Sequence, residues 1–327
     1  MPRYLQATTE RFAVAGSFTI SRGTRTHADV VTCTIRDGSF TGRGECVPYP
    51  RYGESIEGVI ADIEAMAEQI AGGLTRHELQ QVMKPGAARN AVDCALWDLE
   101  AKMSGKSAAE HSLGHAAKPL VTAYTISLAD PETMAAKTAE NAGRPLLKIK
   151  TGTADDEARL RAVRTAAPDA RIIIDANEGW NDDNIEYYLK LAAELNIALI
   201  EQPLPAGKDA ILARIDHPVP ICADESVHST KDLADLRDRY DAINIKLDKT
   251  GGLTEALVMK AEAERLGFII MVGCMLGTSL GMAPAVLAAQ GAAFSDLDGP
   301  LILRQDRQPG LVYEGSLVYP PQPELWG

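Results

Sequence analysis

The chain lacks several features that would each indicate a function. No apolar run reaches the roughly 18 residues of a membrane-spanning helix, and no apolar stretch follows Met1 to Tyr4, so neither a spanning helix nor a signal peptide is predicted. The net charge of −12 argues against nucleic acid as the main partner. The sequence contains no phosphate-binding glycine motif, no Gly-x-Ser-x-Gly elbow and no His-Glu-x-x-His zinc motif.

Cysteine is also sparse, with five thiols at positions 33, 46, 94, 222 and 274 and no Cys-x-x-Cys pair. The odd number and wide spacing do not suit a disulfide framework. We interpret them as reduced thiols and expect a cytoplasmic protein without a membrane partner. With 327 residues and 46% hydrophobic content, the chain is long enough for two domains, or for one barrel with an added module.

Apolar, β-branched stretches recur at even spacing after residue 115, and their ends lie 22 to 28 residues apart. The predicted strands are 121–127, 146–150, 171–175, 197–201, 220–224, 242–246, 268–274 and 293–298. Helical patterns lie between them at 131–142, 155–167, 182–195, 209–215, 230–239, 253–266 and 277–290. This alternation predicts parallel strands with right-handed crossovers, and eight such strands close a β/α barrel. A doubly wound open sheet is the structural alternative.

Residues 1–115 show a different pattern, in which strand-like stretches precede helices. Strands are expected at 9–20, 27–36 and 40–46, and amphipathic helices at 55–71 and 87–103. Strands followed by helices indicate an α+β module. We therefore predict this module over residues 1–115, a barrel over residues 116–300, and a tail over residues 301–327 that returns to pack on the N-terminal module.

Charged residues end most of the predicted barrel strands, where the active site of a β/α barrel forms. Lys148 and Lys150 alternate, so both amines leave one face of the second strand. Mutual repulsion in a buried setting would favour a neutral amine that can act as a base. The simpler interpretation is a solvated edge strand with two surface lysines. The other charged strand ends are Asp175, Glu201, Asp224, Lys246, Asp296 and Asp298.

Asp175, Glu201 and Asp224 end three successive strands. Three carboxylates on one side of the barrel mouth suit one Mg²⁺ or Mn²⁺ ion that keeps coordination positions open for a ligand. The alternative for Asp175 and Asp224 is helix capping, because each precedes a predicted helix. Since the three acidic residues end neighbouring strands, we predict a metal site.

Lys150 and Lys246 lie four strands apart, which places them on opposite walls of an eight-stranded barrel. One lysine could remove a proton from a carbon on one face, and the other could return a proton to the opposite face. A metal beside them would stabilise the charge of the enolate. The alternative for Lys246 is a structural ion pair with a carboxylate.

Two sets of segments resemble known families. Segments 148–150, 175–178, 201–204, 223–226 and 244–246 resemble the strand ends of the enolase superfamily, in its muconate-lactonizing subgroup, whose members use a Lys or His base with Mg²⁺. Segments 21–25, 45–55, 86–90, 246–253 and 295–300 are similar to dipeptide epimerases that act on L-Ala-D/L-Glu from peptidoglycan. The resemblance implies an α/β fold, a modified TIM-type (β/α) barrel with an N-terminal α+β capping domain, and Mg²⁺-dependent epimerisation of dipeptides in murein peptide metabolism.

The resemblance also implies roles for the strand-end residues. Lys150 and Lys246 match the two bases of the family, and Lys148 matches a helper that contacts the substrate carboxylate and lowers the basicity of Lys150. One magnesium ion per subunit is implied. The residues that match its ligands are Asp175, Glu201 and Asp224.

Four further residues match substrate-binding positions of these epimerases. Asp296 and Asp298 match a pair that receives the α-ammonium group of the dipeptide, for which paired carboxylates are well suited; a turn before Gly299 is the alternative. Arg25 matches the residue that meets the glutamate side chain, although an arginine near a turn is more often a surface residue. Thr125 matches a position that lines the substrate.

Several points stay open at the level of sequence. Tyr49, Tyr52, His228 and the segment 273–278 receive no role, and the preferred dipeptide is not fixed. A β-elimination lyase such as an o-succinylbenzoate synthase would keep the lysines and the metal but would not need Asp296 and Asp298, and the same holds for a muconate cycloisomerase. A non-catalytic barrel that binds metal or peptide is a third alternative. Barrels of this family often self-associate, so a homo-oligomer is an open expectation.

Overall fold

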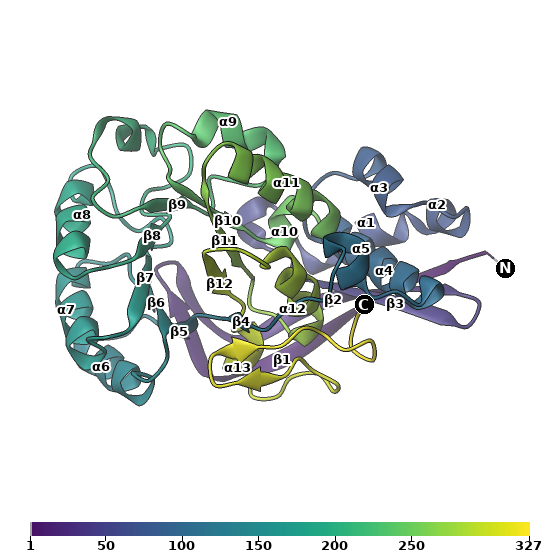
Figure 1. Ribbon diagram of the computed structural model, residues 1–327, viewed down its shortest axis with the longest axis horizontal. Coiled ribbons are helices and arrows are strands. Elements are labelled where there is room, and N and C mark those ends of the chain that lie inside the picture. The colour runs from purple at the N-terminus through teal and green to yellow at the C-terminus, as the bar shows by residue number, and fades with distance from the viewer. Residues whose placement is uncertain (1) are drawn as a thin grey trace.

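The computed structural model describes residues 2–327, which form a small antiparallel sheet with its helices and a larger parallel sheet (Figure 1). The small sheet consists of β1 (Tyr4–Ile20), β2 (Gly23–Asp37) and β3 (Phe40–Cys46). Helices α1 (Ile56–Glu64), α2 (Ala67–Ala71) and α4 (Ala87–Ser104) pack on this sheet, and α3 (Arg76–Val82) packs against α4. The predicted α+β architecture of the N-terminal part is thereby confirmed.

Helix α4 lies directly on strand β3 because two glycines leave room for it. A Cβ atom at Gly42 would lie 2.2 Å from the carbonyl oxygen of Ala95, and one at Gly44 would lie 2.2 Å from that of Ala91. Any side chain at these positions would force the helix away from the strand. The two glycines therefore hold the N-terminal core together by permitting close packing.

Eight parallel strands form the larger sheet, ordered along the chain from β5 to β12. Their bounds are β5 (Tyr124–Ile126), β6 (Leu146–Lys150), β7 (Arg171–Asp175), β8 (Leu199–Glu201), β9 (Ile221–Ala223), β10 (Ala242–Ile245), β11 (Ile269–Gly273) and β12 (Phe294–Asp296). The first and last strands meet where the Ala123 nitrogen donates to the Ser295 oxygen at 2.8 Å. The sheet thus closes into a near-barrel, as predicted, and the open-sheet alternative is wrong.

The connections between barrel strands are mostly the predicted helices. They are α6 (Pro131–Glu140), α7 (Asp156–Ala166), α8 (Ile185–Glu194), α11 (Leu253–Arg265) and α12 (Ser279–Ala288). Figure 1 shows α6, α7 and α8 along one flank of the sheet. Two connections are shorter than predicted, because 3₁₀ turns replace full helices: η2 (Ala210–Arg214), and η3 (Thr230–Asp232) followed by α9 (Leu233–Leu236).

The C-terminal tail contacts both sheets. Strand β14 (Leu317–Val318) pairs with β13 (Tyr313–Glu314) on one side and with β4 (Leu120–Val121), just before the first barrel strand, on the other. At the end of the chain, the Trp326 indole nitrogen donates to the carbonyl of Cys94 on α4 at 2.9 Å. A tail that returns to the N-terminal module would make such contacts, and the domain boundaries at 115 and 300 stay a prediction.

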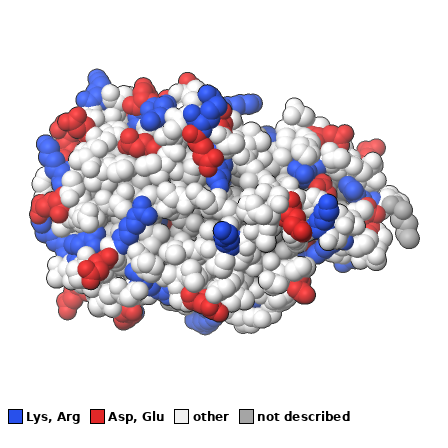
Figure 2. Space-filling model, in the orientation of Figure 1, with Lys and Arg blue, Asp and Glu red and all other residues white. Residues whose placement is uncertain are grey.

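Within residues 2–327, no helix is both long and apolar enough to pass through a membrane. Figure 2 shows basic and acidic side chains interspersed at the two ends of the molecule, with a mostly uncharged middle on this face.

Asp93, at a buried position on α4, links the N-terminal part to helix α11 of the barrel. Its Oδ2 atom accepts a hydrogen bond from the Thr254 nitrogen, at the start of α11, at 3.0 Å, and its Oδ1 atom accepts one from Gln80 at 2.9 Å. Burial raises the pKa of the Asp93 carboxyl from 3.8 to about 6, although the bonds from Thr254 oppose this shift. The folded protein therefore binds a proton here more tightly than the unfolded chain does.

We expect the contribution of Asp93 to the free energy of unfolding to fall as the pH rises from about 4 to about 6, and then to stay level, since the unfolded chain releases this proton first. In Asp93→Asn the new amide can donate to Gln80 Oε1, a buried atom without a partner among the described residues. Relative to wild type, the variant should gain on the order of 2 kcal/mol between about pH 4 and pH 8. Urea denaturation at both pH values measures the change, and a difference that is independent of pH would contradict it.

Candidate active site

The C-terminal ends of the barrel strands surround one cavity with a volume of about 210 Å³. Eight of the ten residues predicted from the sequence line this cavity: Arg25, Thr125, Lys148, Lys150, Asp224, Lys246, Asp296 and Asp298. The other two, Asp175 and Glu201, have no exposed surface and lie beneath it, in contact with the lysines. The fold thus brings all ten residues together.

Strand register places three of these residues side by side. Lys150 is the cross-strand neighbour of Asp175, and Asp175 is that of Glu201. The chain turns sharply just beyond the two acidic residues, where Asn177 and Gln202 adopt left-handed backbone angles, with φ of 45° and 35°. Such backbone angles cost about 1–3 kcal/mol each. The residues of these turns form hydrogen bonds with the acidic strand ends.

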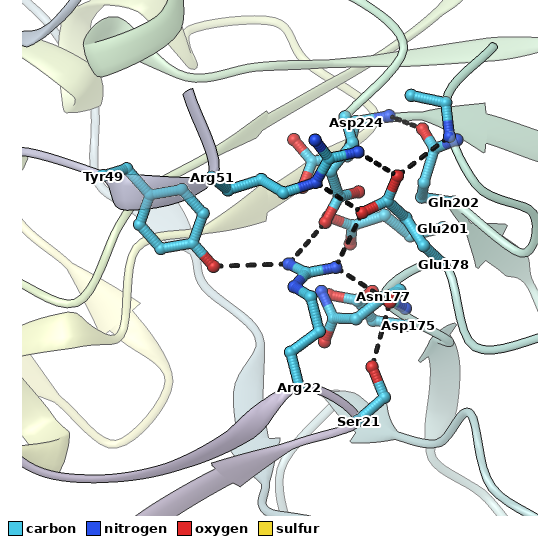
Figure 3. Close-up of polar contacts among 12 residues, drawn as sticks. Ser21, Arg22, Tyr49, Arg51, Asp175, Asn177, Glu178, Glu201, Gln202 and Asp224 are labelled. Atoms are coloured by element: carbon cyan, nitrogen blue, oxygen red, sulfur yellow. Dashed lines mark hydrogen bonds and ion pairs between the residues drawn. The ribbon is translucent and has the colours of Figure 1, made fainter. Parts of the chain in front are cut away.

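The turn residues fix the acidic groups by these bonds. The Asn177 nitrogen donates to Asp175 Oδ1 at 2.9 Å. The side-chain oxygen of Gln202 accepts from the backbone nitrogen of Asp224 at 2.8 Å and from that of Ser226 at 3.1 Å. Figure 3 shows Gln202 directed at the segment that carries Asp224. Asp224, at the end of β9, is therefore positioned by Gln202, which follows the end of the preceding strand β8.

Lysine amines pair with the three strand-end carboxylates. The amine of Lys150 lies 2.6 Å from Asp175 Oδ2, and the amine of Lys246 lies 2.6 Å from Asp224 Oδ2. The amine of Lys148 contacts Asp175 Oδ2 at 3.0 Å and Glu201 Oε2 at 2.6 Å. The two lysines from strands four apart therefore flank one carboxylate cluster, and the ion pair considered for Lys246 is present.

These contacts shift the pKa values in opposite directions. Burial lowers the pKa of the Lys148 ammonium, but the carboxylates of Asp175, Asp296 and Glu201 raise it further, so it lies well above its ordinary value. Burial raises the pKa of Asp224, but the amines of Lys246 and Lys249 bring it well below the usual range. At Lys148, attraction to carboxylates thus outweighs the repulsion between neighbouring amines.

Glu201 is the least compensated of the three acids. Burial, followed by the charge of Asp175, raises the pKa of Glu201 to about 7. Among the described residues, its Oε2 atom accepts no hydrogen bond of acceptable geometry, although the Lys148 amine is near. A buried carboxylate oxygen without a donor is costly unless a cation meets it.

The donor set fits a divalent cation. His, Cys, Asp and Glu side chains in residues 2–327 form no ready-made cluster of three at metal-binding spacing, because lysine amines stand between the carboxylates. The three acids nevertheless each direct one oxygen at these amines, and hard oxygen ligands suit Mg²⁺. A divalent ion that replaced the amine contacts would also satisfy Glu201 Oε2.

Asp296 and Asp298 form a second acidic site on the opposite side of Lys148. Asp296 Oδ2 accepts from Lys148 at 2.7 Å, while its buried Oδ1 atom has no partner in the described part of the chain. Asp298 Oδ2 accepts from the backbone nitrogen of Thr125 at 2.6 Å. Burial, followed by the charge of Asp296, raises the pKa of Asp298 to about 7. The pair is therefore arranged to receive a further cation. The turn considered before Gly299 is also present, because Asp298 is the N-cap residue of the short helix α13 (Gly299–Ile302), although its side chain makes no capping hydrogen bond there.

Comparison with known proteins agrees with this geometry. Residues 132–321 match the family described as enolase C-terminal domain-like, and residues 5–111 match the N-terminal domain of the mandelate racemase and muconate lactonizing enzymes. The chain belongs to the enolase superfamily. The family predicted from the strand-end motifs and the predicted barrel with its N-terminal domain are both confirmed.

Relatives of this enolase-superfamily chain include proteins named as an epimerase and as a racemase. The L-Ala-D/L-Glu epimerase of Escherichia coli is 46% identical over 90% of this chain and 93% of its own length. The N-acetyl-D-glutamate racemase of a Pseudoalteromonas species is 43% identical over 91% of this chain and 95% of its own length.

Crystal structures of superfamily members superpose closely on this one. An enolase family member from Agrobacterium tumefaciens with homology to dipeptide epimerases, solved with sodium and L-Ala-L-Glu bound, is 90% identical, with a TM-score of 0.99 over 100% of both chains. The dipeptide epimerase of Cytophaga hutchinsonii, solved with Mg and D-Ala-L-Val, is 28% identical, with a TM-score of 0.91 over 98% of this chain and 94% of its own.

In the present structure, two segments of the N-terminal part bind to the rim of the barrel, as Figure 3 shows. Arg22, in the turn between β1 and β2, pairs with Glu225 Oε1 at 2.7 Å and donates to the Asn177 carbonyl at 2.8 Å. Arg51, in the 3₁₀ turn η1 (Pro50–Tyr52), pairs with Glu178 Oε1 at 2.8 Å. These contacts close the N-terminal layer over the cavity.

Several cavity residues are not among those predicted from the sequence. Arg22, Asn177 and Glu225 line the cavity, and each lies within a few positions of a predicted residue. The apolar part of the wall includes Phe18, Ile20, Met275, Leu276 and Ile302. Tyr49 and Tyr52 also line it, and the Arg25 guanidinium lies 5.1 Å from the Tyr49 ring centre.

Proposed function

We propose that this chain is an Mg²⁺-dependent dipeptide epimerase, an isomerase that inverts the α-carbon of the second residue in dipeptides of the L-Ala-D/L-Glu type. The observation that carries the proposal is the flanking of one carboxylate cluster by Lys150 and Lys246, whose amines come from strands four apart. Relatives named as epimerases at 46% and 34% identity support the same reaction.

In the proposed mechanism, one lysine removes the α-proton from one face of the carbon, and the other delivers a proton to the opposite face. Lys150 and Lys246 take these two roles. Lys148, held charged by its carboxylate neighbours, places positive charge beside the substrate carboxylate as the α-proton leaves. Mg²⁺, held by Asp175, Glu201 and Asp224, would supply further positive charge to that carboxylate.

The remaining predicted residues orient the dipeptide. Asp296, with its unpartnered Oδ1 atom, and Asp298 receive the α-ammonium group. Thr125 fixes Asp298 through its backbone nitrogen. Arg25, stacked on Tyr49 at the cavity wall, receives the carboxylate of the glutamate side chain. We also propose murein peptides as the source of the substrate and, from the five free cysteines, a cytoplasmic location.

The decisive experiment is incubation with Mg²⁺ and L-Ala-L-Glu in D₂O, followed by proton NMR. The α-proton signal of the glutamate residue should wash out while the L-Ala-D-Glu diastereomer forms. L-Ala-L-Glu has no leaving group on its β-carbon, so an unchanged spectrum would contradict the proposal and indicate either a β-elimination lyase or a binding protein. N-acetyl-glutamate should be run in parallel, because a relative that racemises it is 43% identical. Preference for that substrate would favour an N-acyl amino acid racemase.

Arg25→Met is expected to reduce kcat/KM for L-Ala-L-Glu by about 10-fold or more, the effect of removing a hydrogen bond to a charged group. Turnover of L-Ala-L-Leu, which has no side-chain carboxylate, should change little, because methionine keeps most of the packing against Tyr49. Steady-state kinetics on the two dipeptides measure the difference. An equal loss on both would assign Arg25 a structural role.

A further inference from the structure

The three acids of the proposed metal site share an arrangement of their oxygen atoms. One oxygen of each carboxylate is held from outside the cluster by a protein donor. Asp175 Oδ1 accepts from the Asn177 nitrogen at 2.9 Å, and Asp224 Oδ1 accepts from the Lys249 amine at 2.5 Å. Glu201 Oε1 accepts from the Asn244 side-chain nitrogen at 2.8 Å.

The second oxygen of each acid faces the reactive lysines. Asp175 Oδ2 meets Lys150 at 2.6 Å, and Asp224 Oδ2 meets Lys246 at 2.6 Å. Glu201 Oε2 lies 2.6 Å from an amine as well, that of Lys148. The outer donors thus leave one oxygen of each acid to face the lysine amines.

Asn244 holds the middle acid from a position with little freedom to move. It lies on β10 two residues before Lys246, so both side chains leave the same face of the strand. The residue is fully buried, and its carboxamide occupies space left by Gly273 on the neighbouring strand β11. A Cβ atom at Gly273 would lie 2.7 Å from Asn244 Oδ1 and 2.8 Å from its Nδ2 atom.

We propose that Asn244 is a positioning residue for the metal: it fixes Glu201 by one oxygen, so that the other oxygen is presented to Mg²⁺. Gly273 provides the space that the Asn244 side chain occupies. Lys249 holds one oxygen of Asp224, and the Asn177 nitrogen holds one oxygen of Asp175, as Asn244 does for Glu201. Each acid then binds the ion through a single oxygen. The inference rests on the proposed metal site and adds the residues that orient it.

Asn244→Leu is the direct test, because leucine is similar in shape and removes the donor without changing the charge. Loss of a hydrogen-bond partner of a metal ligand typically weakens metal binding by about 10- to 100-fold, and we expect an increase in the Mg²⁺ dissociation constant within this range. Calorimetric titration with Mg²⁺ measures it, and the electron paramagnetic resonance signal of free Mn²⁺ gives an independent value. At saturating Mg²⁺, most of the turnover should return.

A second variant covers the case in which Asn244→Leu does not fold. Gly273→Ala retains Asn244 but pushes its carboxamide away from Glu201, so Mg²⁺ binding should weaken here as well. Met271→Leu, a volume-conserving change at the cross-strand neighbour of Asn244, is the matched control and should bind Mg²⁺ as wild type does.

The outcomes separate this inference from the proposed function. Wild-type affinity for Mg²⁺ in a folded Asn244→Leu or Gly273→Ala protein would overturn the positioning role and leave the metal site standing. Absence of Mg²⁺ binding by the wild-type protein would overturn the metal site itself, and with it this inference. A larger Mg²⁺ dissociation constant in the variant, with turnover recovered at high Mg²⁺, supports both the metal site and the positioning role of Asn244.

Discussion

Replacing Lys246 by alanine is expected to abolish epimerisation of L-Ala-L-Glu, while one of the two diastereomers still exchanges its α-proton with solvent. The reason is that inversion requires a base on each face of the carbon, whereas exchange requires only one. A positioned general base is typically worth 10²- to 10⁴-fold in rate, and we expect epimerisation to fall by at least about 1,000-fold. Lys150→Ala should show the same loss, with exchange retained by the opposite diastereomer.

Proton NMR in D₂O, run separately on L-Ala-L-Glu and L-Ala-D-Glu, measures exchange and inversion together. Lys137→Ala, which removes an exposed lysine of α6 that pairs with Glu140, is the matched control and should keep full activity. If Lys246→Ala turned over both diastereomers at the wild-type rate, the mechanism with two bases would be wrong.

The ion pairs of the site bear on how the lysines become bases. The amine of Lys150 donates a hydrogen bond to Asp175 Oδ2, and the amine of Lys246 donates one to Asp224 Oδ2. The carboxylates of Asp224 and Glu201 raise the pKa of Lys246 well above its ordinary value, against the effect of burial. An amine held in this way is a poor base. Lys246 can therefore act as a base only when Asp224 Oδ2 has another cationic partner, which links the proposed catalysis to the proposed metal site.

Much of the site could be predicted because its chemistry is concentrated at strand ends. Lys150, Asp175 and Glu201 each terminate a short run of buried apolar residues, and parallel strands bring such ends to one edge. The resemblance to epimerases then supplied Arg25 and Thr125, which no periodicity would select. The roles of all these residues stay predictions, although the fold places them around one cavity.

Other residues escaped prediction for identifiable reasons. Asn244 alternates with Lys246, as Lys148 does with Lys150, so the sequence contained the signal that it faces the site. The apolar wall could not be predicted, because Met275 and Ile302 follow strands as ordinary hydrophobic residues and reach the cavity only through the fold.

The helices that escaped prediction are short and lack long apolar periodicity. Helices α3 and α5 (Ala108–Leu113) nevertheless each begin with a capping box, Thr75 with Glu78 and Ser107 with Glu110. The predicted helix at 55–71 instead divides into α1 and α2 at Ala65 and Met66, although neither residue is a glycine or a proline and Gly58 lies inside α1. Both helices pack on β1, a tertiary contact that is not visible in the sequence.

Asp298→Asn is expected to lower kcat/KM for L-Ala-L-Glu on the order of 100-fold at pH 8, since removing one partner of a buried charge pair costs about 2–5 kcal/mol. Asparagine keeps an oxygen that can accept from the Thr125 nitrogen, so the cavity wall should keep its shape. N-acetyl-glutamate has no ammonium group, and any turnover of it should be unaffected by the substitution. A lyase, which has no ammonium group to bind, would also tolerate the change.

The pH dependence gives this prediction a second and independent measure. The pKa of Asp298 is raised to about 7 by burial and by Asp296, so the free wild-type enzyme loses the negative charge that binds the ammonium group as the pH falls through that value. The wild-type kcat/KM should therefore decline below about pH 7, and Asp298→Asn should lack this decline, so that the two proteins converge in acid.

A raised pKa also means that the ionised carboxyl of Asp298 lowers the free energy of unfolding above pH 7. The variant should accordingly be at least as stable as wild type in urea at pH 8, and a loss of activity could not be attributed to unfolding. Parallel pH profiles of the two enzymes would show that Asp298 does not bind the ammonium group.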